Sequence, residues 1–185
     1  TVGGVAVITA RTAPGNDHHG ISAFIVPLDT PGVVRGKKED KVGMRVSDTS
    51  SLIFEDVYVP ADALLAGEGE GFVQAMEVLD GGRISISALG LGIARGALAA
   101  AVDYARQRKQ FGRPIASFQG IQFKLADMSV LVSAAELLTW RAAEAKDSGE
   151  KTTRLSSEAK LFAAEAAVRV AEEAVQIHGG YGYTK

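Results

Sequence analysis

The segment Arg106–Gln119, with the sequence RQRKQFGRPIASFQ, gathers guanidinium, aromatic and amide groups in a short break between two helical stretches. Gly112 and Pro114 turn the chain there, and a helix is expected to begin at about Ser117. The first free N–H groups of a helix attract anions, and arginine binds phosphate through a planar fork of donors. This combination suits a phosphorylated ligand that carries a flat ring.

Ordinary structural roles also account for parts of this segment. Arg106 and Arg108 stand at the end of the preceding helix, where positive side chains favour the helix dipole and bind its last carbonyls. Phe111, immediately before Gly112, could instead fill the core beneath the turn. The residue types alone leave these alternatives open.

Glycines inside the predicted first helix indicate a second unusual place, because each costs about 1 kcal/mol there relative to alanine. At the DGGR sequence of Asp80–Arg83 we favour a ligand that fills the missing side-chain volume. At Gly90, Gly92 and Gly96 we favour the close approach of a neighbouring backbone instead.

The sequence QIHGGYGY, residues 176–183, ends the last predicted helix. Its glycines are suited to a helix C-cap, and they would also let a backbone press against a flat ligand. His178 stands alone, and His18 and His19 have no third ligand beside them, so we predict no metal site.

Composition excludes several classes of function. The 185 residues carry a formal net charge of −2 and no basic face, which argues against nucleic acid as a partner. The absence of cysteine excludes disulfides and thiolate catalysis. No consecutive apolar run reaches the roughly 18 residues of a membrane span. Because the chain begins at Thr1 without methionine, we expect it to be part of a longer polypeptide.

Residues 1–66 are predicted to form a small antiparallel sheet or half-barrel. Val5–Thr9, Ile21–Pro27 and Ser51–Pro60 are rich in β-branched and aromatic residues and are separated by turn-forming segments. The mixed charges of Lys37–Lys41 are interpreted as a solvated turn. We place the domain boundary at the glycine-rich linker Ala66–Gly71.

Residues 67–185 are predicted to be an all-α, up-down helical bundle. The first helix, of about 35 residues, has one stripe of positions at helical spacing: Phe72, Met76, Leu79, Arg83, Ile86, Gly90, Ile93, Ala97, Ala100 and Tyr104. The second stripe contains Phe118, Ile121, Leu125, Met128, Val132, Ala135, Leu138 and Ala142, and ends near Ser148. The third contains Leu155, Ala159, Phe162, Ala166, Val170 and Ile177. Closing a four-helix bundle requires one more helix, expected beyond Lys185.

The chain resembles the acyl-CoA dehydrogenase family, most of all its short-chain, butyryl-CoA type, in six segments: SAFIVP, GKKEDKVGMR, LIFEDVYVP, GEGFVQAMEVLDGGRISISALGLGIARGAL, YARQRKQFGRPIASFQGIQFKLADM and AVQIHGGYGYTK. By this resemblance, residues 1–66 are the later part of the middle β domain. Residues 67–185 are the first three helices of the C-terminal four-helix bundle. The N-terminal domain and the C-terminal end would then lie outside the chain.

The resemblance implies an FAD site at the interface between subunits. Its residues in this chain would be Arg108, Gln110, Phe111, Gln119, Gln176, Ile177, His178, Gly179 and Gly180. Arg108 would meet the FAD pyrophosphate of a neighbouring subunit, with the ring of Phe111 near the adenosine. The implied acyl-CoA contacts are Asp80, Gly81, Gly82 and Arg83, where Arg83 addresses the CoA and the two glycines leave room for the thioester.

The reaction implied by the resemblance is α,β-dehydrogenation of a short-chain acyl-CoA in fatty acid β-oxidation, with electrons passing to an electron-transfer flavoprotein. A homotetramer built as a dimer of dimers is also implied, in the bacterial cytoplasm or the mitochondrial matrix. We nominate no catalytic residue in this chain, because the usual glutamate motif would follow Lys185 and the alternative position is Gly82. Two other possibilities are an acyl-CoA oxidase and a non-catalytic helical assembly subunit.

Overall fold

The chain divides into two structural units, residues 1–77 and 78–185, which are described separately. The computed structural model describes residues 2–15 and 17–184. Thr1 and Lys185, the outer ends of the predicted domains, and Asn16 in a predicted loop lie outside the described residues. The two units divide within the first long helix, and the predicted domain boundary between residues 66 and 67 stays a prediction.

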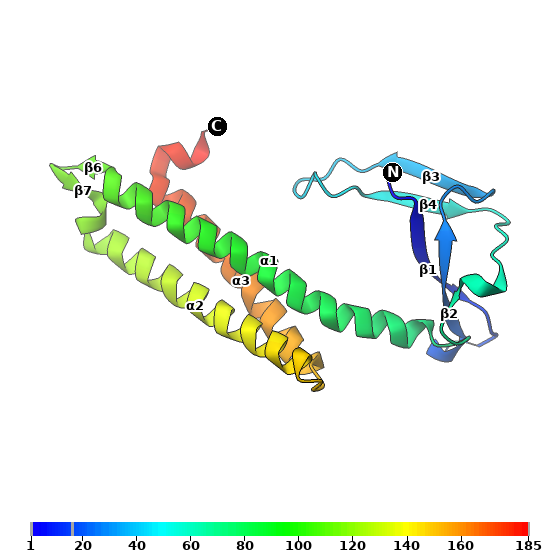
Figure 1. Cartoon of the computed structure of the whole chain (residues 1–185). Helices are drawn as coiled ribbons and strands as arrows, with labels where there is room; N and C mark the ends of the chain where they lie inside the picture. Colours follow the sequence, from blue (N-terminus) through cyan, green and yellow to red (C-terminus); the bar gives the residue numbers. More distant parts are fainter. Residues whose placement is uncertain (1, 16, 185) are drawn as a thin grey trace. The chain divides into compact units, whose positions relative to one another are not determined.

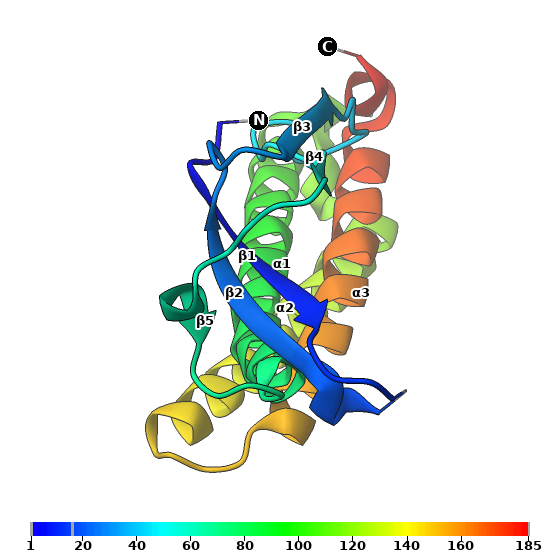
Figure 2. The same cartoon turned by 90° about the vertical axis from the view of Figure 1, so that its right-hand side faces the viewer.

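Two small antiparallel sheets make up the first unit. Strand β1 (Val5–Arg11) pairs with β2 (Ile21–Pro27), which also pairs with the short β5 (Leu64–Leu65), and Figure 2 shows β1 and β2 side by side. Strand β3 (Val33–Lys38) pairs with β4 (Ser50–Phe54). The expectation of antiparallel β structure is confirmed.

The sequence prediction missed β3 and extended β4 too far. Lys37 and Lys38 belong to β3, which pairs with β4 across an irregularity between Arg35 and Lys38, so they are not part of a solvated turn. The pairing partner decides this strand, because its own sequence has weak apolar alternation. Strand β4 ends at Phe54, shortly before Asp56 adopts a positive φ of 50° that strand geometry does not accept.

The second unit is a bundle built on three long helices (Figure 1). Its elements are the later part of α1 (Gly71–Gln107), β6 (Lys109–Gln110), β7 (Arg113–Pro114), the 3-10 turn η3 (Ile115–Ser117), α2 (Gln119–Asp147), α3 (Thr153–His178) and the 3-10 turn η4 (Gly179–Tyr183). The predicted fold class, a β segment followed by an all-α bundle, is confirmed.

The bundle core is built mainly of alanine and small aliphatic side chains. Leu91, Ala94, Ala101 and Ala105 of α1 share one buried cluster with α2 and α3 residues. The contributions of the other two helices are Met128, Val132, Ala135, Ala163, Ala166, Ala167, Val170, Ala174 and Ile177. Small side chains allow helix backbones to approach closely, so the core is thin and depends on close packing.

Gly90 lies where α1 meets α3. A Cβ added to it would lie 3.0 Å from the carbonyl oxygen of Ala163, which confirms the expected close approach of a backbone. At Gly92 and Gly96 a Cβ would meet no described atom within 4 Å, so the same expectation stays a prediction there. Only one of the three glycines therefore occupies the helix crossing.

Most of the stripe predicted for α1 lies outside its buried face, although Gly90 is buried. Ile86 and Ile93 are 49% and 50% exposed, whereas Ser87 and Ala94, one position further along, are fully buried. Helix α1 is apolar on more than one face, and periodicity alone did not select the face that meets α2 and α3. Ile86 and Ile93 are thus exposed apolar side chains of α1 within the second unit.

By length and composition alone, α1 could cross a membrane, and it is the one helix of this kind in residues 2–15 and 17–184. Polar residues and glycines interrupt the apolar runs of α1, so no consecutive apolar run in the sequence reaches the length of a membrane span. A core helix of a bundle has the same composition, and Leu91 and Ala101 place α1 in the shared core of the second unit.

Candidate functional site

A tight hairpin follows the end of α1. Lys109 pairs with Pro114 and Gln110 with Arg113, which leaves Phe111 and Gly112 as a two-residue loop. Both loop residues have positive φ values, 50° and 78°, as a type I′ turn requires. The hairpin leads into η3, so α2 begins at Gln119, two residues after the predicted start.

Phe111 is 93% exposed at the tip of this hairpin, so the alternative that it fills the core is wrong. Its ring meets Phe118 edge to face, with the centroids 6.1 Å apart, and the guanidinium of Arg113 covers Phe118 at 4.3 Å. A positive φ costs a residue other than glycine about 1–2 kcal/mol. The chain thus holds an aromatic ring in solvent at a cost in backbone energy, as is common for contact residues.

Phe111→Asn is expected to be more stable than Phe111→Ala by about 1 kcal/mol, because asparagine tolerates a positive φ better than alanine. Both variants lose the ring contact with Phe118, so their difference isolates the backbone term. Urea unfolding monitored by circular dichroism measures it. Equal stabilities would show that the hairpin does not force this conformation on residue 111.

Arg108 lies where α1 ends and the hairpin begins. Its N–H donates to the carbonyl of Tyr104, and its own carbonyl accepts from the N–H of Ile115, both at 2.8 Å. Its side chain is exposed, and within residues 2–15 and 17–184 its guanidinium has no ion pair and no hydrogen bond to a helix carbonyl. The capping role considered for Arg108 is therefore not realised, and its donors are available to a ligand.

The end of α3 lies opposite the hairpin. Gly179 adopts φ 59° and donates its N–H to the carbonyl of Gln176, so the expected glycine C-cap is confirmed. Nδ1 of His178 is 2.7 Å from the carbonyl oxygen of Ala174, and the ring of His178 stacks on Tyr104 with centroids 4.4 Å apart. Because a carbonyl can only accept, Nδ1–H of His178 is the donor in this contact.

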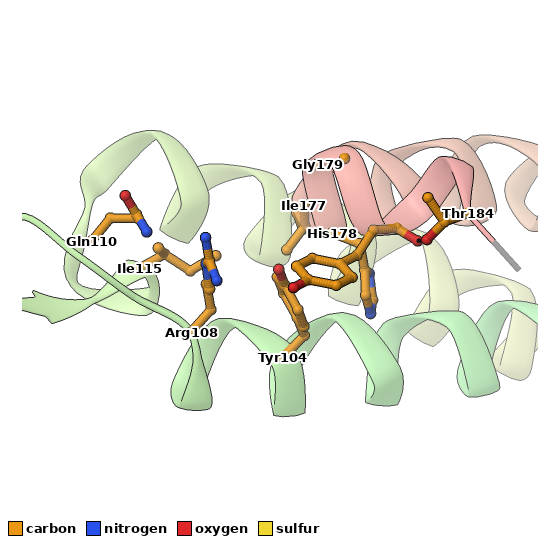
Figure 3. Close-up of a pocket in the computed structure, with 10 residues that line it drawn as sticks. Tyr104, Arg108, Gln110, Ile115, Ile177, His178, Gly179 and Thr184 are labelled. Carbon is orange, nitrogen blue, oxygen red and sulfur yellow. Dashed lines mark hydrogen bonds between the residues drawn. The ribbon is translucent and has the colours of Figure 1, made fainter.

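These two ends enclose a cavity of about 480 Å³ (Figure 3). Its lining residues are Tyr104, Arg108, Gln110, Ile115, Ile177, His178, Gly179, Gly180, Tyr181 and Thr184. Six of the nine residues expected at the cofactor site are among them. Three are not, namely Phe111 at the hairpin tip, Gln119 in the first turn of α2 and Gln176, whose side chain is exposed.

Tyr104, Ile115, Tyr181 and Thr184 line the cavity and were missed as site residues. Tyr104 belongs to the apolar stripe predicted for the first helix, and Tyr181 lies within the QIHGGYGY segment. Both are aromatic residues near the ends of α1 and α3, and the tertiary structure brings these two ends together. One arginine, aromatic faces and no carboxylate make the cavity suitable for an anionic group attached to a flat ring.

The Asp80–Arg83 segment lies in α1 far from this cavity. The carboxylate of Asp80 forms an ion pair with Arg83 and accepts a hydrogen bond of 2.7 Å from Oγ1 of Thr153 at the start of α3. Asp80 is thus held by protein partners, and it fixes Arg83 against the end of the bundle. From Arg83 to Arg108 is 25 residues, or about 38 Å along a helix.

The two glycines of this segment differ in their surroundings. A Cβ on Gly81 would overlap Nζ of Lys146, whereas a Cβ on Gly82 would meet no described atom within 4 Å. The space above Gly81 is therefore taken by a lysine of α2. The open volume in the described structure lies at Gly82, and a ligand beside either glycine stays a prediction.

No group of three or more His, Cys, Asp or Glu side chains is placed to hold a metal ion in the described part of the chain. His18 and His19 stack on each other with centroids 4.0 Å apart, and His18 also contacts Phe72. These rings pack beside the start of α1 within the first unit.

Comparisons with known proteins give the same family for both units. The model of the acyl-CoA dehydrogenase C-terminal domain matches residues 69–185, and that of the acyl-CoA dehydrogenase middle domain matches residues 1–57. The mitochondrial short-chain specific acyl-CoA dehydrogenase of Bos taurus is 51% identical over 179 residues, which are 97% of this chain and 43% of that protein.

Two solved structures extend this similarity to the fold. Butyryl-CoA dehydrogenase from Megasphaera elsdenii is 50% identical with a TM-score of 0.94, and the match covers 97% of this chain and 47% of that one. A structure described as PigA with FAD and proline is 28% identical with a TM-score of 0.95, covering 99% and 48%. The chain spans about half the length of the relatives it matches.

Proposed function

We propose, from the premise that this chain belongs to the acyl-CoA dehydrogenase family of FAD flavoproteins, that its complete polypeptide oxidises a short-chain acyl-CoA to the trans-2-enoyl-CoA. Bound FAD would supply a hydride acceptor for the β-hydrogen while a base removes the α-proton, so that the thioester loses two hydrogens and two electrons. Homology to short-chain acyl-CoA dehydrogenases supports this substrate class.

The observation that carries the proposal is that Arg108 lines the cavity without an acidic partner among the described residues. An arginine without an acidic partner among the described residues, beside the amide of Gln110 and the backbone of Gly179 and Gly180, supplies donors for a diphosphate. The neighbouring ring of Tyr104 gives this end of the site an apolar face. We assign this cavity to the nucleotide end of FAD.

The substrate end is assigned to the other part of α1. Arg83, oriented by Asp80, would bind the CoA, and the open face at Gly82 would accommodate the thioester. We assign no catalytic base to this chain. The base would be a glutamate outside residues 1–185.

The separation of the two ends supports an assembled enzyme. Because Arg83 and Arg108 are about 38 Å apart along one helix, one subunit would supply the substrate end and its neighbour the diphosphate contact of each site. Exposed apolar side chains on α2 and α3, such as Leu137 at 71% and Leu161 at 60%, support further helix packing in a dimer of dimers. The compartment follows the source, the mitochondrial matrix or the bacterial cytoplasm.

The purified complete polypeptide is expected to be yellow, and its flavin absorbance should bleach when butyryl-CoA is added without oxygen. Electron-transfer flavoprotein should then be reduced in the coupled assay. Rapid hydrogen peroxide formation in air, without that protein, would favour the acyl-CoA oxidase alternative. A colourless protein that does not take up added FAD would favour a non-catalytic assembly subunit and contradict the proposal.

A further inference from the structure

One side chain of the cavity contacts Arg108 without being a predicted ligand. Cζ of Arg108 lies 5.9 Å from the centre of the Tyr181 ring, within the range of a cation–π contact. Among the described residues no ion pair or side-chain hydrogen bond involves this guanidinium, and the Tyr181 ring is its one cation–π partner. The orientation of Arg108 therefore depends on where Tyr181 lies.

Aromatic packing in turn places Tyr181. The centroid of the Tyr104 ring lies 6.4 Å from that of Tyr181, and the two rings are tilted relative to each other. The Tyr104 ring also stacks on the ring of His178. His178 is fixed by its hydrogen bond to the carbonyl of Ala174. Figure 3 shows Tyr104 and His178 close together at the cavity beside Arg108. The contacts therefore form a series from His178 to Tyr104 to Tyr181, which ends at the guanidinium of Arg108.

The backbone of η4 brings Tyr181 to this position. Gly179 reverses the chain at φ 59°, and a Cβ on Gly182 would collide with the carbonyl oxygen of Val175, so the turn folds back against α3 as only glycine permits. Tyr183, two residues later in the same turn, is 79% exposed and does not line the cavity. The turn therefore directs one of its two tyrosines toward Arg108.

We propose that Tyr181 is a positioning residue, which holds the Arg108 guanidinium ready for a diphosphate. The inference rests on the proposed function of the cavity. An arginine side chain samples many rotamers in solution, and restricting them before the ligand arrives lowers the entropy lost on binding. Tyr181 thus acts on the affinity for the cofactor through Arg108, and its hydroxyl group is not required.

The test uses the complete polypeptide, freed of flavin and titrated with FAD while flavin fluorescence is recorded. Tyr181→Leu should weaken FAD binding about threefold to tenfold, Tyr181→Phe should keep wild-type affinity, and the matched control Tyr183→Leu should have no effect. Tyr181→Met, which keeps more side-chain bulk, should behave like Tyr181→Leu. Because Tyr181 is 67% exposed, thermal unfolding of the flavin-free variants should match the wild type.

The decisive measurement repeats Tyr181→Leu in an Arg108→Met background. If Tyr181 acts through Arg108, the second substitution causes no further loss of FAD affinity. An equal loss in both backgrounds, or a loss with Tyr181→Phe, would mean that Tyr181 binds FAD directly and would overturn the inference. If Arg108→Met alone leaves FAD affinity unchanged, the assignment of the cavity to FAD is wrong instead.

Discussion

Arg108→Met in the complete polypeptide is expected to weaken FAD binding by about 10- to 100-fold. Hydrogen bonds to a charged group contribute about 1.5–3 kcal/mol, and each 1.4 kcal/mol is a factor of ten in affinity. The side chain has no ion pair among the described residues, so its removal should leave the stability of the flavin-free protein nearly unchanged. Titration of the flavin-free protein with FAD measures the loss.

Two further variants show what part of Arg108 matters. Arg108→Lys keeps the charge but loses the planar fork, and it should fall between the wild type and Arg108→Met. Arg106→Met removes a neighbouring charge from the same helix end without touching the cavity lining, and it should bind FAD normally. A loss of equal size in Arg106→Met would show a general effect of charge at the helix end and would contradict a specific diphosphate contact.

Mixing Arg83→Met subunits with Arg108→Met subunits is expected to give more activity than either variant has alone, at an FAD concentration that does not saturate Arg108→Met. If each site takes its substrate end from one subunit and its diphosphate contact from the next, a mixed dimer has one site with both arginines intact. Random assembly makes half of the dimers mixed, so about a quarter of all sites should be active. The large gain arises because Arg83 and Arg108 lie about 38 Å apart on one helix and serve different sites.

Co-expression from two promoters, followed by purification through two different affinity tags, isolates the mixed oligomers for the dehydrogenase assay. The control is a chain that carries both substitutions, paired with the Arg83→Met chain, because no dimer of these two variants contains an intact site. Mixed oligomers no more active than the mean of the two single variants would show that one subunit supplies both arginines. The proposal that FAD bridges two subunits would then fail.

The sequence predicted the three helices well because each has 26 or more residues and the apolar period is sampled many times. For α2 and α3 the predicted stripes contain the buried residues Met128, Val132, Ala159 and Val170. Both helices also carry exposed apolar side chains elsewhere, such as Leu137 and Leu161, but their predicted stripes coincide with the buried face. For α1 the choice failed because apolar residues surround the helix, and only packing against the other two helices selects the buried face.

The strands of the first unit could not be predicted fully, because local sequence does not show which strands pair. Strand β3 has three charged or polar side chains near its end, Arg35, Lys37 and Lys38, and it exists because β4 provides a partner. Strand pairing joins residues far apart along the chain, so the pattern of one strand carries only part of the information. For the same reason, the end of β4 was placed too late.

The sequence by itself determined the family, through motifs such as RKQFGRP and QIHGGYGY, and with it the segments where a ligand is expected. The tertiary structure decided that the end of α1 and the end of α3 form one cavity, that Phe111 lies in solvent, and that Tyr104 and Tyr181 lie beside Arg108. Spacing along a chain fixes which residues share a helix face. Contacts between residues more than 70 positions apart, as between Arg108 and Tyr181, depend on how the helices pack.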